Sequence, residues 1–261
     1  MNRVRNYQKE LDQLIERIGA AKECPPTLFL HSCCAPCSSY VLEYLRQYFW
    51  ITVFYYNPNI TEDAEYRKRV AEQKRLIAAY NEELTKKVNK NQDGVAEQDT
   101  VAEQDAGAVE DAVAKQYAGS VQDTGTVHGV DRQQAESTAY WIDVIEGDYE
   151  PQRFFDMAKG LEQCPEGGGR CFACYELRLR ETAKLAREGG YDYFTTTLSI
   201  SPLKNAAKLN EIGEKLAQEY GAVWLPSDFK KREGYKRSIE LSKEYGLYRQ
   251  DYCGCVYSRR Q

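Results

Sequence analysis

The grouping of its cysteines restricts this chain more than any other feature. Seven of the nine fall in three short sets, while Cys24 and Cys164 stand apart. The sets are Cys33-Cys34-Ala35-Pro36-Cys37, Cys171-Phe172-Ala173-Cys174 and Cys253-Gly254-Cys255. The first residues alternate charged and apolar side chains, whereas a signal peptide needs an uninterrupted apolar stretch. Without a secretory signal, the thiols are predicted to be metal ligands or redox groups and not a disulfide framework.

The number of cysteines indicates which kind of metal site the chain can hold. One tetrahedral zinc ion takes four thiolates. A structural zinc would use the two pairs separated by two residues, Cys34 with Cys37 and Cys171 with Cys174, and would leave the other three cysteines of the sets unexplained. A [4Fe–4S] cluster with room for a second metal accounts for the number better, because soft thiolates suit both.

The order of expected elements predicts the fold class. Short apolar or β-branched runs at 27–31, 51–55, 140–145, 191–197 and 222–225 are typical of strands. Helical patterns occupy 38–48, 62–80, 174–188, 201–220 and 234–245, with a short helix after Pro151. This alternation predicts an α/β fold, a Rossmann-like parallel sheet with helices on both faces. In such sheets ligands bind at the carboxyl ends of the strands, so the metal site is expected there, where the first cysteine set follows the first strand.

An acidic, repetitive segment interrupts this pattern. We expect residues 1–261 to form a single α/β domain in which 89–138 is a low-complexity insertion, mobile and without catalytic work. The chain's net charge of −5 comes largely from this segment, and the rest is mildly basic. No stretch approaches the roughly 20 apolar residues that span a bilayer, so we expect a cytoplasmic protein without a membrane partner.

Longer strings around the cysteines resemble one known family. The strings are LFLHSCCAPCSSY at 28–40, YYNPNI at 55–60, RCFACYELRL at 170–179, TTTLSISPLKN at 195–205 and YRQDYCGC at 248–255. They look like the motifs of the QueH-type epoxyqueuosine reductases, in family order, and the resemblance runs from about Thr27 to Ser258.

The resemblance implies a reaction and its cofactors. Members reduce the epoxide of epoxyqueuosine, at the wobble position of tRNA, to the cyclopentene-diol of queuosine. The resemblance also implies a [4Fe–4S] cluster with an additional metal ion, expected to be iron, and electrons from an unidentified donor. The residues here that match the family's metal-binding motifs are Cys33, Cys34, Cys37, Cys171, Cys174, Cys253 and Cys255. How they divide between the cluster and the second metal is left open.

The remaining candidate residues are proton donors and contacts to the tRNA. Asp251 is a candidate oxygen ligand or proton donor, and Tyr252 and Tyr175 are candidate proton donors. Candidate contacts to phosphate or substrate hydroxyls are Ser199, Ser201, Lys204, Asn205 and Arg249. Further positive charge for tRNA is expected from Arg178, Arg180, Lys208, Lys230, Lys231, Arg232, Lys236, Arg237, Arg259 and Arg260. Histidine catalysis is not expected, because the only histidines are His31, in a buried strand, and His128, in the insertion.

Two other functions are weighed against this one. A tRNA sulfur transferase of similar fold would need a glycine-rich phosphate loop after the first strand, but residues 33–37 contain no glycine. A zinc-stabilised RNA-binding module without catalysis would hold zinc and no iron. Metal analysis after anaerobic purification separates these alternatives.

Overall fold

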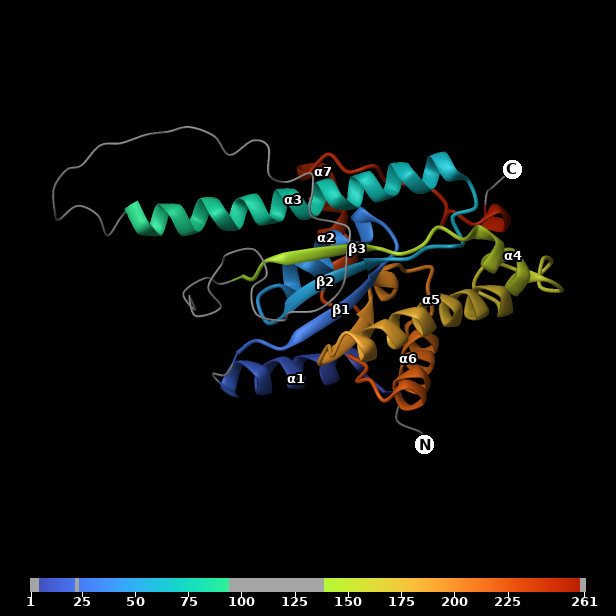
Figure 1. The fold of residues 1–261 in the computed structure, drawn as a ribbon, viewed down its shortest axis with the longest axis horizontal. Helices are drawn as coiled ribbons and strands as arrows, with labels where there is room; N and C mark the ends of the chain where they lie inside the picture. Colours follow the sequence, from blue (N-terminus) through green and yellow to red (C-terminus); the bar gives the residue numbers. More distant parts are fainter. Residues whose placement is uncertain (1–4, 22–23, 94–138, 259–261) are drawn as a thin grey trace. The chain divides into compact units, whose positions relative to one another are not determined.

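The computed structural model describes residues 5–21, 24–93 and 139–258. Its strands are β1 (Thr27–Ser32), β2 (Trp50–Tyr55), β3 (Ile142–Glu146) and β4 (Tyr193–Thr196). Its helices are α1 (Tyr7–Ala21), α2 (Ala35–Leu45), α3 (Asp63–Asp93), α4 (Pro151–Ala158), α5 (Gly169–Glu188), α6 (Ala206–Tyr220) and α7 (Gly234–Glu244). Two short 3₁₀ turns, η1 (Thr197–Ile200) and η2 (Val256–Ser258), follow β4 and the last cysteine set. Figure 1 shows their arrangement.

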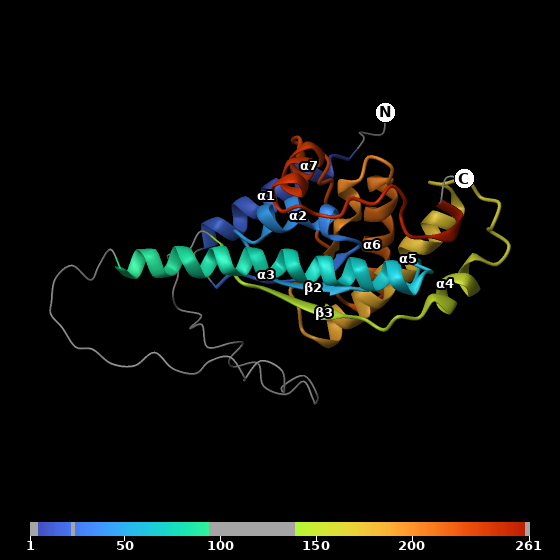
Figure 2. The ribbon, with the colours of Figure 1, turned by 90° about the horizontal axis from the view of Figure 1, so that it is seen from above.

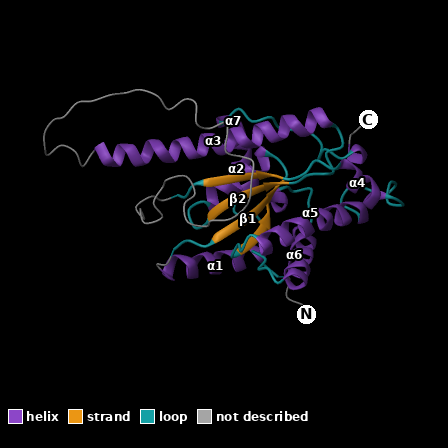
Figure 3. Ribbon diagram, in the orientation of Figure 1, coloured by secondary structure: helices purple, strands orange, loops and turns teal. Residues whose placement is uncertain are grey.

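The four strands form one parallel sheet in the order β3-β2-β1-β4 (Figure 3). Side chains alternate along each strand, so each face of the sheet receives its own set. In β1, Leu28 and Leu30 join a core with residues of α1, α2 and α3, whereas Phe29 joins a core with residues of α5 and α6. Helix α7 packs against α2 (Figure 2). The predicted α/β sheet with helices on both faces is therefore confirmed.

The strand order places a crevice beside β1. After β1 the chain adds β2 and then β3 on one side, and it returns to add β4 on the other side of β1. At such a reversal the loops that leave the two central strands diverge, and ligands bind between them at the carboxyl ends. The first cysteine set follows β1, and Thr197 follows β4.

Several expected boundaries are wrong for identifiable reasons. The helix expected at 38–48 begins at Ala35, because Pro36 lies in its first turn, where its fixed φ suits a helix. The helix expected from 174 begins at Gly169. The helix expected from Ser201 begins at Ala206, because the Asn205 side chain accepts the Lys208 N–H and caps it. The run 222–225 is not a strand; it makes one bridge, between Phe194 and Trp224. The helix expected at 62–80 continues to Asp93.

Two further expectations concern the chain as a whole. Residues 1–84 with 139–261 form one compact unit and 85–138 a second. Only 85–93 of the second unit are described, so most of the predicted mobile insertion at 89–138 lies outside the described residues and stays a prediction. In the part of the chain that the structure describes, no helix is long and apolar enough to cross a membrane.

Candidate metal centre

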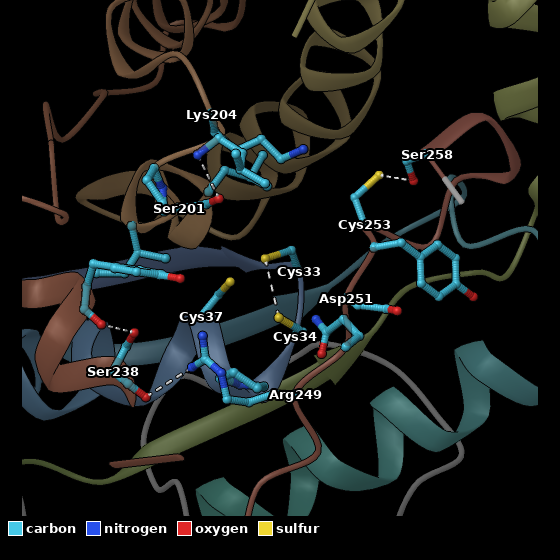
Figure 4. Close-up of a pocket in the computed structure, with 18 of the residues that line it drawn as sticks. Cys33, Cys34, Cys37, Ser201, Lys204, Ser238, Arg249, Asp251, Cys253 and Ser258 are labelled. Carbon is cyan, nitrogen blue, oxygen red and sulfur yellow. Dashed lines mark hydrogen bonds between the residues drawn. The ribbon is translucent and has the colours of Figure 1, made fainter. Parts of the chain in front are cut away.

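The first cysteine set forms a compact group of three thiols. The sulfur atoms of Cys33, Cys34 and Cys37 all lie within 4.8 Å of one another. Cys33 and Cys34 have their sulfurs 3.8 Å apart (Figure 4). Cys34 is extended, with φ of −176°, and precedes α2, while Cys37 lies in the first turn of that helix. The change from extended backbone at Cys34 to helix in α2 therefore lets the adjacent side chains of Cys33 and Cys34 point to the same side.

Buried polar side chains hold this turn in place. The Ser38 hydroxyl donates to the Cys34 carbonyl at 3.0 Å, and the Ser32 hydroxyl donates to Oε1 of Gln73, on α3, at 2.8 Å. Asn57 donates from Nδ2 to the Ser32 carbonyl at 2.8 Å. Ser32, Ser38, Asn57 and Gln73 are all buried. Inside the protein, where no water can replace the lost partner, breaking such hydrogen bonds is costly. These bonds therefore hold the backbone of the cysteine turn in place without a bound ligand.

The end of β4 holds the other side of the group. Thr197 Oγ1 accepts a hydrogen bond from the Cys33 N–H at 3.3 Å and lies 3.6 Å from its sulfur. Nearby, His31 Nε2 donates to the Tyr56 carbonyl at 3.1 Å, and the Thr196 hydroxyl donates to Nδ1 at 2.8 Å. Burial, with the charge of Arg178, lowers the pKa of His31 to about 3. Both ring nitrogens of His31 are thus engaged in hydrogen bonds inside the protein.

A cavity of about 190 Å³ opens above these thiols. Cys253 lines it together with Cys33, Cys34 and Cys37, so the third cysteine set faces the same cavity as the first (Figure 4). Of the other predicted site residues, those that line the cavity are Ser201, Lys204, Arg249, Asp251 and Tyr252.

Two predicted substrate contacts lie elsewhere. The Ser199 side chain is buried, 3.1 Å from the Ser227 hydroxyl, and accepts the Phe229 N–H at 3.3 Å. The Asn205 side chain caps α6. Neither residue lines the cavity, so the structure gives both of them a role in holding the loop after β4.

The second cysteine set packs beside the third. Cys171 lies in the first turn of α5 and Cys174 in the second, and Cys174 is buried in one apolar cluster with Cys255. Cys253 packs against that cluster and also lines the cavity. Among the described residues, only the first set brings three metal-ligating atoms within 4.8 Å. The structure thus links the three sets through Cys253 without drawing all seven sulfurs into one group.

Two buried cations lie among the thiols. Burial opposes the charge of Arg178, but the thiolates of Cys174, Cys33 and Cys253 raise its pKa overall. Burial likewise opposes the charge of Lys204, yet the Cys253 thiolate raises its pKa. Both side chains line the cavity and are therefore positive beside groups that become negative on ionisation.

Hydrogen bonds among the three thiols of the first set shift their pKa values in different directions. Hydrogen bonds from Cys34 and Cys37 hold the pKa of Cys33 well below its usual value. The bond to Cys33 raises the pKa of Cys34 to about 12, and it also raises that of Cys37. Of the three, Cys33, next to Thr197, is therefore the thiol whose ionisation these contacts favour.

The burial of Arg178 corrects one expectation. It is 4% exposed and donates to the Cys174 carbonyl at 3.2 Å, so it cannot meet tRNA phosphate as the sequence suggested. Other predicted phosphate contacts form ion pairs with carboxylates: Arg180, Lys208, Lys230, Arg232, Lys236 and Arg237. Arg259 and Arg260 lie outside the described residues.

Sequence reasoning missed several residues of the cavity wall, among them Leu203, Tyr235 and Arg69. Arg69, on α3, is 2% exposed, forms an ion pair with Glu65 at 2.6 Å and donates to the Tyr252 carbonyl at 3.3 Å. Its guanidinium also lies over the Tyr252 ring, 5.1 Å from the centroid. An arginine in a highly charged helix carries no sequence signal that separates it from its exposed neighbours.

Comparison with known proteins identifies the family. A family model described as epoxyqueuosine reductase QueH matches residues 28–108 and 128–261. The chain belongs to the QueH family. A QueH relative from Staphylococcus epidermidis is 38% identical over 255 residues, which cover 97% of this chain and 84% of the relative. Relatives from Staphylococcus aureus (36% over 258 residues, 98% and 85% covered) and Streptococcus pyogenes (33% over 255 residues, 98% and 78% covered) carry the same description.

The comparison also bears on the sequence motifs. Every string quoted for the resemblance lies inside the matched ranges, so the QueH resemblance is confirmed. Residues 109–127, which the family model does not match, fall within the acidic segment.

Proposed function

We propose that this protein reduces the epoxide of epoxyqueuosine in tRNA to the alkene of queuosine with the help of a metal centre held by its cysteines. Membership of the QueH family supports the reaction. The metal dependence that we propose rests on one observation, the group of thiols that Cys33, Cys34 and Cys37 form beside the cavity. The epoxide oxygen leaves as water, so each turnover consumes two electrons and two protons.

The thiols suit a metal centre chemically. Two thiolates that bind one metal ion at tetrahedral angles, with metal–sulfur bonds of about 2.3 Å, have their sulfurs about 3.8 Å apart. The sulfurs of Cys33 and Cys34 are 3.8 Å apart. Because seven thiols exceed the needs of one metal ion, we infer a [4Fe–4S] cluster together with a further iron ion. When bound, such a centre supplies electrons one at a time and a Lewis-acidic iron.

Packing supports a division of the seven cysteines into two neighbouring groups. Cys33, Cys34 and Cys37 are the candidates for the first. Cys171 and Cys174, from α5, with Cys253 and Cys255, from the C-terminal segment, are the candidates for the second. Cys253 belongs to the buried cluster and to the cavity wall, which makes it the connection between the two groups.

The other cavity residues have roles that follow from their chemistry. Arg178 and Lys204 offset negative charge that gathers on the thiolates. Asp251 and Tyr252 are the candidate sources of the two protons, since both line the cavity. Ser201, Lys204 and Arg249 line it as well and are candidates to contact substrate hydroxyls or a phosphate. Cavity contacts give no support to such a role for Ser199 and Asn205.

The proposed partners are a tRNA with a modified wobble nucleoside and an electron donor that is not yet identified. A tRNA substrate is in keeping with a cytoplasmic location, which we propose for this protein. Family membership does not favour a sulfur transferase or a zinc-stabilised RNA-binding module.

Anaerobic purification followed by metal analysis and a turnover assay tests the proposal. We expect iron with acid-labile sulfide, and conversion of epoxyqueuosine to queuosine in tRNA when a strong reductant is added. Zinc without iron, or an iron-loaded protein that leaves the epoxide intact, would refute it. The conversion is read by mass spectrometry of the digested tRNA.

A further inference from the structure

The mouth of the cavity has an unusual composition. The large apolar side chains exposed among the described residues are Ile145, Phe155, Leu203, Val223, Tyr235 and Val256. Of these, Leu203 and Tyr235 line the cavity, with exposures of 64% and 37%. Leu203 lies in the turn between η1 and α6, and Tyr235 lies in the first turn of α7. Two segments far apart in the sequence thus present apolar surface at the same opening.

The size of the cavity determines what part of a substrate it can enclose. Pockets that bury most of a drug-sized ligand begin at about 300 Å³. At about 190 Å³, this cavity lies below that range and suits a small ring such as an epoxide-bearing cyclopentane better than a whole nucleoside. The planar base to which that ring is attached is then expected at the mouth.

From this we propose that Tyr235 and Leu203 form a binding site for the base of the modified wobble nucleotide, which stacks on them while its epoxide ring enters the cavity. The inference rests on the proposed function for its substrate. Base stacking on an aromatic side chain is a common way in which proteins hold an unstacked RNA base.

The backbone beneath Tyr235 is held firmly enough for this role. A Cβ on Gly234 would lie 2.0 Å from the Phe229 carbonyl oxygen and 2.4 Å from the Tyr40 ring, so the start of α7 fits closely against both. The Ser238 hydroxyl donates to the Tyr235 carbonyl at 2.7 Å. A rigid aromatic platform loses little conformational entropy when a base stacks on it.

A positive charge lies on the same side of the mouth. Arg249 lines the cavity and donates to two groups of α7, the Ser242 hydroxyl at 3.0 Å and the Ser238 carbonyl at 3.5 Å (Figure 4). A guanidinium held by the helix that presents Tyr235 suits the phosphate of the same nucleotide. Apolar surface for the base and charge for its phosphate therefore occur together.

The test compares Tyr235→Ala with Phe155→Ala in the full, metal-loaded chain. Phe155 is the matched control because it is also 37% exposed and does not line the cavity. Tyr235→Ala should raise the KM for epoxyqueuosine-containing tRNA roughly 10-fold, as alanine at stacking positions does. It should leave kcat and iron content unchanged, because the base contact is the same before and during the chemical step. Phe155→Ala should alter none of these values, and Tyr235→Phe should keep the wild-type KM.

Binding provides a readout that is independent of turnover. The Kd of a labelled anticodon stem-loop carrying the modified base, measured by fluorescence anisotropy, should rise with Tyr235→Ala in the same proportion as KM. Leu203→Ala should raise KM and Kd as well. Val223→Ala is its control and should change neither value, because Val223 is 52% exposed and does not line the cavity.

Unchanged KM and Kd in Tyr235→Ala and in Leu203→Ala would overturn the inference, and so would a loss confined to kcat. If the wild-type protein binds this RNA but does not reduce it, the proposed function fails while the binding comparison still decides the role of Tyr235.

Discussion

Gly254 shows how one residue can determine the geometry of a thiol pair. It separates Cys253 from Cys255 and has a φ of +96°, which side chains disfavour. A Cβ there would also lie 2.6 Å from Ile60 Cγ1 and 3.2 Å from Nη1 of Arg69. The glycine therefore lets the backbone turn sharply and closely enough to present both sulfurs to the second proposed group.

Replacing Gly254 with alanine should consequently disturb the metal centre as well as the fold. We expect Gly254→Ala to cost roughly 1–3 kcal/mol in backbone strain, and to lower bound iron, because Ile60 is buried and cannot move aside freely. Thermal unfolding and iron per chain after anaerobic reconstitution measure the two effects.

Gly246→Ala is the control for this variant. Its φ is also positive, +57°, but a Cβ would meet nothing within 4 Å. Gly246→Ala should lower the free energy of unfolding by roughly 1–2 kcal/mol, because alanine is strained in the left-handed conformation. Its iron content should stay at the wild-type level. Equal iron content in both variants would show that the contact at Gly254 does not matter for the site.

Residue identities could be predicted from the sequence only where a pattern marks them. The spacing of the cysteines and the surrounding strings predicted Cys33, Cys34, Cys37 and Cys253, which the cavity brings together. Arg178 was predicted as a tRNA contact because composition cannot distinguish a buried cation from a surface one, and its burial follows from packing of α5 that no local pattern encodes.

At the scale of elements, the C-terminal segment depends on α3 for its position. Residues 248–258 contain only the short turn η2. They are held by Glu72, which accepts the Tyr248 N–H at 2.7 Å, by Asn59, which donates to the Cys253 carbonyl at 3.1 Å, and by Arg69. Cys253 and Cys255 are therefore placed by side chains of other elements.

Arg69→Met should release this segment. Because Arg69 is buried and paired with Glu65, its loss leaves a carboxylate uncompensated and should cost about 3–5 kcal/mol. Hydrogen exchange of the backbone amides in 248–258 should accelerate, and bound iron should fall. Arg67→Met, on the same helix, removes an exposed pair with Asp63 and should do neither. Slow exchange in 248–258 of Arg69→Met would contradict the role given to α3.

Element order was more predictable than element ends. The strands β1, β2, β3 and β4 all lie within or beside the runs expected from hydrophobicity, because burial on both faces imposes that pattern. Helix starts were missed at Ala35, Gly169 and Ala206, since proline, glycine and asparagine at several nearby positions can all begin a helix. These errors matter for the site, because Cys37 lies in the first turn of α2 and Cys171 in the first turn of α5, and not in the loops before them.

At the scale of the whole molecule, sequence-distant cysteines gather in and beside one cavity. The loop after β1, the start of α5 and the C-terminal segment supply them, and Arg178 interacts electrostatically with Cys174, Cys33 and Cys253. The topology explains the meeting, because the strand order opens a crevice next to β1 at the carboxyl ends. No single segment could hold such a centre alone.

Iron and acid-labile sulfide per chain, measured after anaerobic reconstitution of single variants, test this claim most directly. Cys34→Ala, Cys171→Ala and Cys253→Ala should each lower bound iron in a protein that remains folded, because each removes a ligand from one of the three sets. Cys24→Ala is the control, since Cys24 is exposed and outside the cavity. Cys164 is less suitable, because its sulfur lies near Gly169, the first residue of the helix that carries Cys171. The account predicts iron loss in the first three variants and none in Cys24→Ala, and full iron in Cys171→Ala or Cys253→Ala would contradict it.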